Sequence, residues 1–411
     1  MHFRERIIKD TMMYSVANYI AMVVGIFLSI VTKNILGALG AGYFAMIKVF
    51  ISYGDLSDLG SRDAMLREVA QAVGSGKNEE ARKVRDVVFC FTLISSAIVV
   101  LIFMGISLFY IKDPILRYGV MIAGPLVFVT QLYNFMITFM RILKRVFSLS
   151  LTIVVNILGV AFFSILGAYA GGVFGMVTGL IIAALFSAYF AYRASGTQLG
   201  IRWEPREILR LVRIGLPLVI SGYAMSVFLS VDAIMIGKMI GYKQLGFYTI
   251  ALMSVQQINS LGRFTQIILQ PYVQEKYGKE KNLVSSKSLF VKSTSVLIYL
   301  LPVFIAMIYY GVPVVVNYFL PKFILGLSAM RILTAAYYFV AVNEMSASIL
   351  FTINKQSRTI PIFIAMTAFA IGLNYLFIVM GQGIKGVAFA TAISFFCYFV
   401  IFFCYAFKHL M

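Results

Sequence analysis

Residues 48–68 read KVFISYGDLSDLGSRDAMLRE. Much of this stretch is apolar enough for a membrane span, yet it contains Lys48, Asp55 and Asp58, and Arg62 lies close behind. Charged side chains inside a membrane are energetically costly, so they face the interior of a helix bundle or a watery cavity and mark function. The stretch therefore predicts a membrane protein with a polar interior.

The composition of the whole chain supports this prediction. It is 61% hydrophobic and 12% charged, with a mean hydropathy of +0.91, whereas soluble domains are about 25% charged. Apolar runs recur along the chain, and most reach the roughly 20 residues that cross a bilayer core as a helix. We expect an all-α polytopic membrane protein with about twelve spans, at 12–32, 43–61, 87–110, 115–139, 147–168, 173–192, 214–236, 246–268, 289–311, 329–352, 360–380 and 384–407.

The distribution of positive charge predicts the orientation of these spans. Of the 35 Lys and Arg residues, 25 fall in segments on the side of the N-terminus, eight fall on the other side, and Lys48 and Arg263 lie within spans. This bias predicts that both termini are cytoplasmic, in a multi-pass protein of the cell (inner) membrane. The positive charge indicates anionic lipid headgroups as neighbours, and we expect no nucleic-acid partner.

An internal repeat divides the chain into two halves. KNILGALGAGYFA at 33–45 is similar to GKMIGYKQLGFYT at 237–249, and GVFG at 172–175 is similar to GIKG at 383–386. The two offsets are alike, which predicts two six-helix repeats related by an axis along the membrane normal. We expect an N-terminal lobe at 1–193, a cytoplasmic linker at 194–213 and a C-terminal lobe at 214–411.

Polar residues at helical spacing form stripes on matching spans of both halves. The second span carries Lys48, Ser52, Asp55 and Arg62, with Asp58 one turn before Arg62. The eighth span carries Gln256, Asn259, Arg263, Gln266 and Gln270. Weaker stripes run through the fourth and tenth spans, at Gln131, Asn134, Thr138 and Arg141, and at Tyr337, Glu344, Ser348 and Thr352. Such stripes predict a watery cavity between two lobes, which is typical of transporters.

Several of these residues have a structural alternative. Asp58, Arg62 and Asp63 fit an interfacial ion-pair cluster equally well. Lys48 and Arg263 lie near the membrane surfaces, where long side chains snorkel to water. Glu344 in mid-span fits either ion coupling or a buried hydrogen bond, and Asp232 fits helix capping or an ion pair with Lys238.

Other function classes lack their characteristic residues. The chain has no Gly-rich phosphate loop followed by Lys and Ser or Thr. Its two histidines are terminal and its three cysteines lie in apolar runs, so we expect no catalytic residues, no metal site and no cofactor. The predicted extramembrane loops are too short for a soluble domain. We therefore expect a protein that acts within the membrane and is not an enzyme.

Specific motifs resemble one family. DLG at 58–60, with Arg67 and Glu68 beyond it, resembles the polysaccharide flippases (O-antigen type) of the MOP exporter superfamily. DAIMIGKMIGYKQLGFYTIA at 232–251 resembles the same proteins, and GLPLVIS at 215–221 is similar to the opening of their second half. The similarity extends over nearly the whole chain in span number, loop length and repeat.

The resemblance implies a V-shaped, MATE-like bundle that works by alternating access. Its cargo would be an oligosaccharide repeat unit on a polyprenyl diphosphate, flipped for the biosynthesis of surface polysaccharide such as O-antigen lipopolysaccharide, capsule or exopolysaccharide. Partners would be this lipid-linked oligosaccharide, membrane lipids, the polysaccharide polymerase and other assembly proteins. The candidate contacts for the diphosphate are Arg263, Lys48, Arg141 and Arg62. Sugar hydroxyls would bind Gln256, Asn259 and Gln266, and a proton or sodium ion would couple through Glu344, Asp55 or Asp232.

Three alternatives stay open. A cation-coupled drug or metabolite antiporter of the same superfamily would share the fold, but its cavity would be dominated by carboxylates. A membrane polysaccharide polymerase or glycosyltransferase would need a sizeable extramembrane loop. A passive scramblase or a structural membrane protein would not need charged stripes on both repeats.

Overall fold

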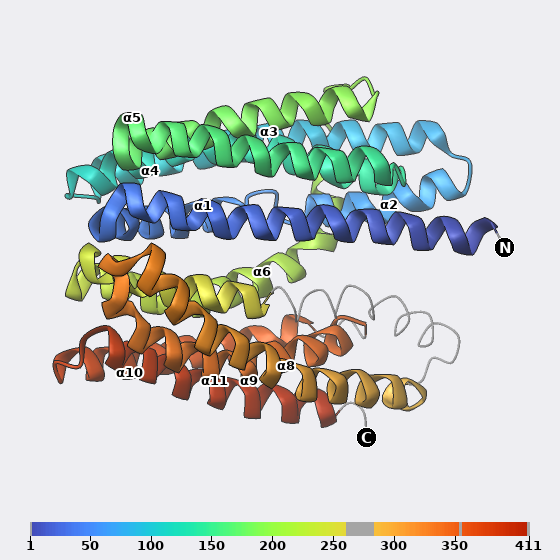
Figure 1. Cartoon of the computed structure of the whole chain (residues 1–411). Helices are drawn as coiled ribbons and strands as arrows, with labels where there is room; N and C mark the ends of the chain where they lie inside the picture. Colours follow the sequence, from blue (N-terminus) through green and yellow to red (C-terminus); the bar gives the residue numbers. More distant parts are fainter. Residues whose placement is uncertain (1, 260–282, 353–355, 409–411) are drawn as a thin grey trace. The chain divides into compact units, whose positions relative to one another are not determined.

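The fold is known from a computed structural model that describes residues 2–259, 283–352 and 356–408. Helices make up nearly all of the described part of the chain, and no described residue lies in a strand. The helices in Figure 1 are α1 (His2–Gly54), α2 (Ser61–Gly74), α3 (Asn78–Phe109), α4 (Pro114–Ile142), α5 (Val146–Ser195), α6 (Pro205–Met235), η1 (Ile236–Ile240), α8 (Leu283–Phe319), η2 (Pro321–Gly326), α9 (Leu327–Thr352), η3 (Gln356–Thr359), α10 (Ile360–Val379) and α11 (Gly383–Lys408). Residues 242–259 are also helical.

The predicted membrane spans are confirmed as apolar helices. Within the described residues, nine helices are long and apolar enough to cross a membrane. Two of the nine are divided by glycines with non-helical backbone angles, α1 at Gly37 and α5 at Gly171 and Gly172. Each divided helix therefore supplies two of the predicted spans. The eighth predicted span, 246–268, lies partly outside the described residues.

The repeat is visible in the backbone. Gly37 and Gly241 occupy equivalent positions in the two halves, and both have positive φ, at 64° and 115°. Gly172 and Gly383 are a second equivalent pair, with φ of 55° and 57°. Because side chains other than glycine are strained in this region, the matched glycines mark equivalent turns of the two repeats.

The second predicted span ends earlier than expected. The prediction continued this helix to residue 61, but α1 ends at Gly54 and α2 begins at Ser61. Leu59 and Gly60 both have positive φ, so the backbone between the two helices turns sharply. Asp55 and Asp58 therefore lie in a turn, and the prediction of one continuous helical stripe from Lys48 to Arg62 is wrong.

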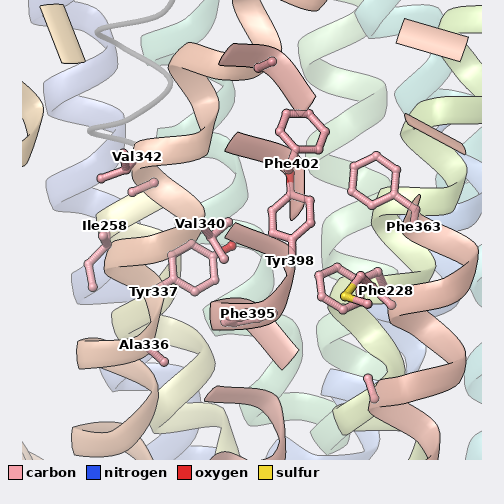
Figure 2. Close-up of a cluster of buried hydrophobic side chains, with 14 of the residues drawn as sticks. Phe228, Ile258, Ala336, Tyr337, Val340, Val342, Phe363, Phe395, Tyr398 and Phe402 are labelled. Carbon is pink, nitrogen blue, oxygen red and sulfur yellow. The ribbon is translucent and has the colours of Figure 1, made fainter. Parts of the chain in front are cut away.

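The chain divides into two compact units. Unit 1 contains Met1–Leu36 and Met46–Val219, and unit 2 contains Gly37–Ala45 and Ile220–Met411. In unit 1, α4 packs against α3 and α5 (Figure 1), and a buried cluster that includes Met65, Phe135 and Leu211 forms its core. In unit 2, α11 packs against α9 and α10 around an aromatic cluster with Phe228 and Tyr398 near its centre (Figure 2).

The second glycine of each repeat has a different role from the first. Gly42 and Gly246, both in unit 2, are not turn residues but permit close backbone contact. A Cβ on Gly42 would lie 1.7 Å from the Tyr242 carbonyl oxygen, and a Cβ on Gly246 would lie 1.7 Å from that of Ala38. No side chain fits at either position, so these glycines allow the two repeat-related segments to touch.

Candidate functional site

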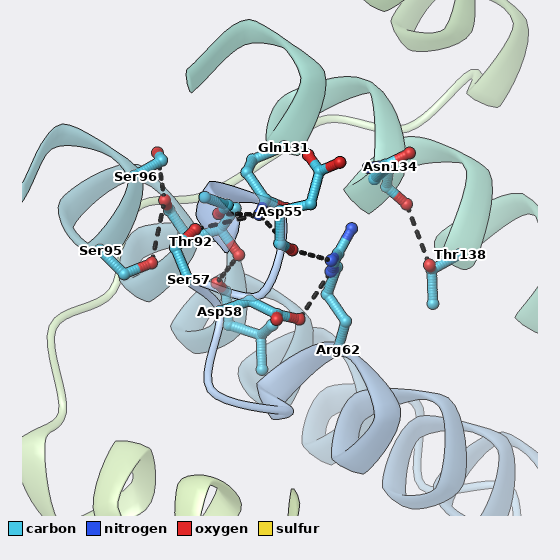
Figure 3. Close-up of polar contacts among 12 residues, drawn as sticks. Asp55, Ser57, Asp58, Arg62, Thr92, Ser95, Ser96, Gln131, Asn134 and Thr138 are labelled. Atoms are coloured by element: carbon cyan, nitrogen blue, oxygen red, sulfur yellow. Dashed lines mark hydrogen bonds and ion pairs between the residues drawn. The ribbon is translucent and has the colours of Figure 1, made fainter. Parts of the chain in front are cut away.

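The turn between α1 and α2 is held by a buried amide from α4. The Gln131 Nε2 donates to the carbonyl oxygen of Asp55 at 2.7 Å and to the Ser57 hydroxyl at 3.0 Å, with a longer contact to the Gly54 carbonyl at 3.3 Å (Figure 3). Gln131 is fully buried. The last carbonyls of a helix have no partner within the helix, so Gln131 supplies one for the end of α1. This residue of the predicted α4 stripe therefore has a structural role.

Arg62 forms an ion pair within the same turn. Its Nε lies 2.6 Å from the Asp58 carboxylate, and its Nη2 donates to the Asp55 carbonyl oxygen at 3.3 Å (Figure 3). Asp58 is buried. Arg62 is thus paired with Asp58, as the ion-pair alternative predicted.

Arg141 and Asp55 complete this polar cluster of unit 1. Arg141, whose side chain is exposed, and Arg62 both act electrostatically on Asp63. Asp55 is half-buried, and its Oδ1 has no hydrogen-bond partner in the described part of the chain. The structure thus brings together two of the predicted site residues, Asp55 and Arg62, and Arg141 acts on the neighbouring Asp63.

Lys48 lies elsewhere in unit 1 and has a neighbour that sequence reasoning missed. The chain runs away from the N-terminus and folds back at the far end of α1 (Figure 1), so the two parts of α1 run antiparallel. Lys33 on the first part donates to the Ser29 hydroxyl at 2.5 Å. Its ammonium group is therefore level with Ser29, roughly 12 Å before Gly37 along the helix.

The Lys48 side chain lies at a similar distance from Gly37, on the second part of α1, which runs antiparallel to the first. Helical side chains lean towards the N-terminal end of their helix, which places the Lys48 ammonium group roughly 10–12 Å beyond Gly37. The charge of Lys48 acts on Lys33. Neither lysine forms an ion pair with a described acidic residue. We call Lys33 and Lys48 the lysine pair.

Asp232 is the best-defined buried acid of unit 2. Its carboxylate accepts a hydrogen bond from the Tyr248 hydroxyl at 2.6 Å and another from the Ala233 N–H at 2.7 Å. Thr391 of α11 is hydrogen-bonded to Tyr248 in turn. Asp232 and Tyr248 are both buried. The Asp232 side chain thus pairs with Tyr248, which sequence spacing did not reveal.

The other predicted residues of unit 2 are more dispersed. Glu344 of α9 is buried and acts electrostatically on the Tyr398 hydroxyl of α11. Gln256 is exposed, and the buried Oδ1 of Asn259 has no hydrogen-bond partner among the described residues. Arg263 and Gln266 lie outside the described residues.

The described residues provide no group of three or more His, Cys, Asp and Glu side chains that fits a metal ion. What they do provide is one pair of lysines in unit 1 and separate buried acids in unit 2. Such sites can bind an anion and carry a proton or a monovalent cation, respectively.

Comparison with solved structures identifies the fold. The fold is similar to that of an inward-facing multidrug resistance MATE family transporter of the MOP superfamily, with a TM-score of 0.78, 17% identity and coverage of 97% of this chain and 98% of that chain. It is similar to an outward-facing structure of such a transporter, with a TM-score of 0.70, 17% identity and coverage of 98% and 95%. A MOP superfamily transporter from Pyrococcus furiosus, described as having a binding pocket of reverse polarity, gives a TM-score of 0.69, 18% identity and coverage of 98% and 95%. The chain therefore has the fold of MOP superfamily transporters.

The family follows from the sequence itself. The family profile described as polysaccharide biosynthesis protein matches residues 42–324. This chain belongs to that polysaccharide biosynthesis family, as the sequence resemblance predicted. No curated protein matches the chain.

Proposed function

We propose that this protein is a flippase that moves polyprenyl-diphosphate-linked oligosaccharides across the cell membrane for surface polysaccharide biosynthesis. The observation that carries the proposal is the combination of a polysaccharide biosynthesis family with a transporter fold. Sugar units built on a lipid carrier have to cross the membrane before they are polymerised outside. A membrane transporter in this family fits that step.

The lysine pair supports an anionic cargo. Two neighbouring cations inside a membrane are costly unless an anion joins them. A diphosphate provides several acceptor oxygens, and charge-assisted hydrogen bonds from ammonium groups replace part of its lost hydration. Lys33 and Lys48 are therefore the first contacts we assign to the diphosphate, ahead of Arg141 and the paired Arg62.

The remaining predicted residues have roles that follow from this cargo. Arg263 would add a further cationic contact, and the amides of Gln256, Asn259 and Gln266 would bind sugar hydroxyls. Asp232 and Glu344 are the first candidates for ion coupling, because both are buried acids in a membrane-spanning unit. Asp55 is the corresponding candidate in unit 1.

The cellular context completes the proposal. Both termini would lie in the cytoplasm, in keeping with the excess of Lys and Arg on that side. The polysaccharide polymerase would be the partner that takes up the flipped unit, in an O-antigen, capsule or exopolysaccharide pathway. Residues 1–193 and 214–411 would act as two lobes in alternating access, joined by a linker at 194–213.

A cation-coupled antiporter of drugs or metabolites is the second candidate. Buried acids in unit 2 favour it, because a carboxylate such as Asp232 also suits an organic cation. The MATE family transporters of similar fold are described as multidrug resistance proteins. The lysine pair favours the flippase.

A transport assay separates the two candidates. Purified protein in proteoliposomes is given a labelled polyprenyl-diphosphate oligosaccharide, and an added glycosidase reports how much of it faces outward. Parallel vesicles contain a fluorescent organic cation in place of the glycolipid, and protein-free vesicles set the background. We expect transfer of the glycolipid above background. Transport of the cation alone would replace this proposal with the antiporter.

A further inference from the structure

The segment between α5 and α6 is fixed to the first turns of α3. The Gly200 N–H donates to the Asp86 carboxylate at 3.1 Å, and the Lys83 ammonium group lies 2.7 Å from Glu204. At the start of the segment, Arg145 donates to the Ser195 carbonyl oxygen at 2.5 Å. Residues 195–204 are therefore held along unit 1 by these three contacts.

The contacts with α3 also define the depth of this segment. At the opposite end of α3, Phe109 and Tyr110 are 83% and 81% exposed, as is typical of aromatic side chains at a membrane interface. A hydrocarbon core of about 30 Å corresponds to roughly 20 helical residues, so it ends near residue 89. Asp86 and Lys83 lie roughly 5–10 Å further out. Residues 200–204 are therefore level with the lipid headgroups.

At this depth the segment presents apolar side chains outward. Ile201 is 75% exposed, Trp203 is 56% exposed and Leu209, on the first turns of α6, is 59% exposed. The opposite face of α6 packs into the core of unit 1 through Ile208 and Leu211. Large apolar side chains at headgroup depth are stable when they insert into the lipid interface.

Two of the four arginines between residues 202 and 213 have charge available for a ligand. Arg202 pairs with Glu204. Arg210 binds Glu68 and Glu207, and these hydrogen bonds raise the pKa of its guanidinium group. Arg206 and Arg213 are exposed and form no ion pair with a described residue. They share the face of α6 that carries Leu209, because positions three, four and seven apart lie together on a helix.

We propose that residues 201–213 form an interfacial anchor that binds anionic phospholipid headgroups. Ile201, Trp203 and Leu209 insert at the boundary between headgroups and acyl chains, and Arg206 and Arg213 bind lipid phosphates beside them. A lipid surface fits better than a protein partner, because the anchor lies at headgroup depth and carries both apolar side chains and uncommitted cations. The anchor does not depend on which cargo the transporter moves.

The fluorescence of Trp203 can report on this anchor, because Trp203 is the only tryptophan in the sequence. The full-length protein is placed in nanodiscs of phosphatidylcholine and phosphatidylglycerol, in which one lipid at a time carries bromine near the headgroup. We expect blue-shifted Trp203 emission and stronger quenching by brominated phosphatidylglycerol than by the brominated choline lipid at equal mole fraction.

Matched variants test the role of the arginines. In Arg206→Gln/Arg213→Gln, the mole fraction of phosphatidylglycerol needed for half-maximal quenching should rise, with affinity falling roughly fivefold for each arginine removed. Arg202→Gln, which removes a paired arginine next to Trp203, should change this mole fraction little. Size-exclusion profiles and thermal stability establish that each variant is folded. Two outcomes would overturn the proposal: Trp203 emission typical of water with no lipid quenching, as expected for a protein-docking surface, or equal quenching by both lipids.

Discussion

At the scale of single residues, the lysine pair shows what sequence spacing can and cannot predict. Lys48 was identified because it interrupts an apolar run. Lys33 lies just beyond the first predicted span (12–32), and its neighbours in sequence give no indication that its side chain reaches back one turn to Ser29. The partner of Asp232 was missed for a similar reason, since Tyr248 is sixteen residues away on another helix. Contacts between helices depend on packing that no local pattern contains.

The lysine pair should contribute directly to cargo affinity. We expect Lys33→Gln and Lys48→Gln each to weaken binding of a polyprenyl-diphosphate oligosaccharide roughly tenfold or more, because each removes a charge-assisted hydrogen bond worth about 1.5–3 kcal/mol. The measurement is ligand-induced thermal stabilisation of the purified variants. Lys112→Gln, at an exposed position between α3 and α4, is the control and should bind normally. Unchanged affinity in both pair variants would remove these lysines from the site.

Asp232 should carry the coupling ion rather than the cargo. Asp232→Asn keeps an oxygen that can accept from the Ala233 N–H, and its Nδ2 can donate to the Tyr248 hydroxyl oxygen, but the amide cannot bind a proton or balance a cation. We therefore expect this variant to fold and bind cargo, with transport that no longer responds to a proton or sodium gradient across the proteoliposome membrane. Gradient-driven transport at the parent rate would contradict the role.

Tyr248→Phe provides a structural comparison for Asp232→Asn. It leaves the buried Asp232 carboxylate without its hydroxyl donor, which should lower the free energy of unfolding by about 1–3 kcal/mol. A comparable loss of stability in Asp232→Asn would mean that the acid is structural.

At the scale of helices, the sequence predicted the spans and the repeat well, because both depend on long apolar runs and on glycines at turns. The end of α1 was wrong by several residues. The turn is stabilised by Gln131 from α4 and by the Arg62–Asp58 ion pair. The spacing of Asp58 and Arg62 predicted that they could pair, but no local pattern shows that Gln131 binds the end of α1. The polar residues predicted to form one continuous stripe therefore lie in two clusters, one at the lysine pair and one at the turn.

The contact between the repeat-related glycines should be intolerant of any side chain. We expect Gly246→Ala to lower the free energy of unfolding by about 1–3 kcal/mol, because its Cβ would collide with the Ala38 backbone. Gly25→Ala is the matched control, since a Cβ at Gly25 of α1 meets nothing within 4 Å. It should be neutral or stabilising by up to about 1 kcal/mol. Thermal unfolding followed by size exclusion measures both, and equal stability of the two variants would contradict the close contact.

The attachment of the interfacial anchor to α3 should weaken at acid pH. The hydrogen bond from Lys83, with a second from Arg202, lowers the pKa of Glu204. An acid with a lowered pKa stabilises the folded state above its ordinary pKa, and this stabilisation is lost as pH falls through the lowered value. Trp203 emission should therefore be constant around neutral pH and change only in the acid range. The acid change should be smaller in Glu204→Gln, and an identical profile in that variant would contradict the attachment.

At the scale of the whole molecule, the fold and the family follow from features that extend over most of the chain. Apolar runs and a repeat predict a polytopic helical membrane protein. Its fold is that of MOP superfamily transporters, and the family profile places it in a polysaccharide biosynthesis family. The cargo depends on a few side chains in two units, and similar folds carry binding pockets of different polarity. The charge of the binding site is therefore the property that decides between a glycolipid and an organic cation.

The most direct test of the central claim compares the parent protein with Lys33→Gln/Lys48→Gln in proteoliposomes containing a labelled polyprenyl-diphosphate oligosaccharide. The initial rate at which the sugar becomes accessible to external glycosidase is measured under an imposed ion gradient. Flipping of a glycolipid through a cationic site predicts rapid transfer by the parent and a loss of at least tenfold in the double variant. No transfer by folded parent protein, in vesicles where the same protein transports an organic cation, would contradict the account.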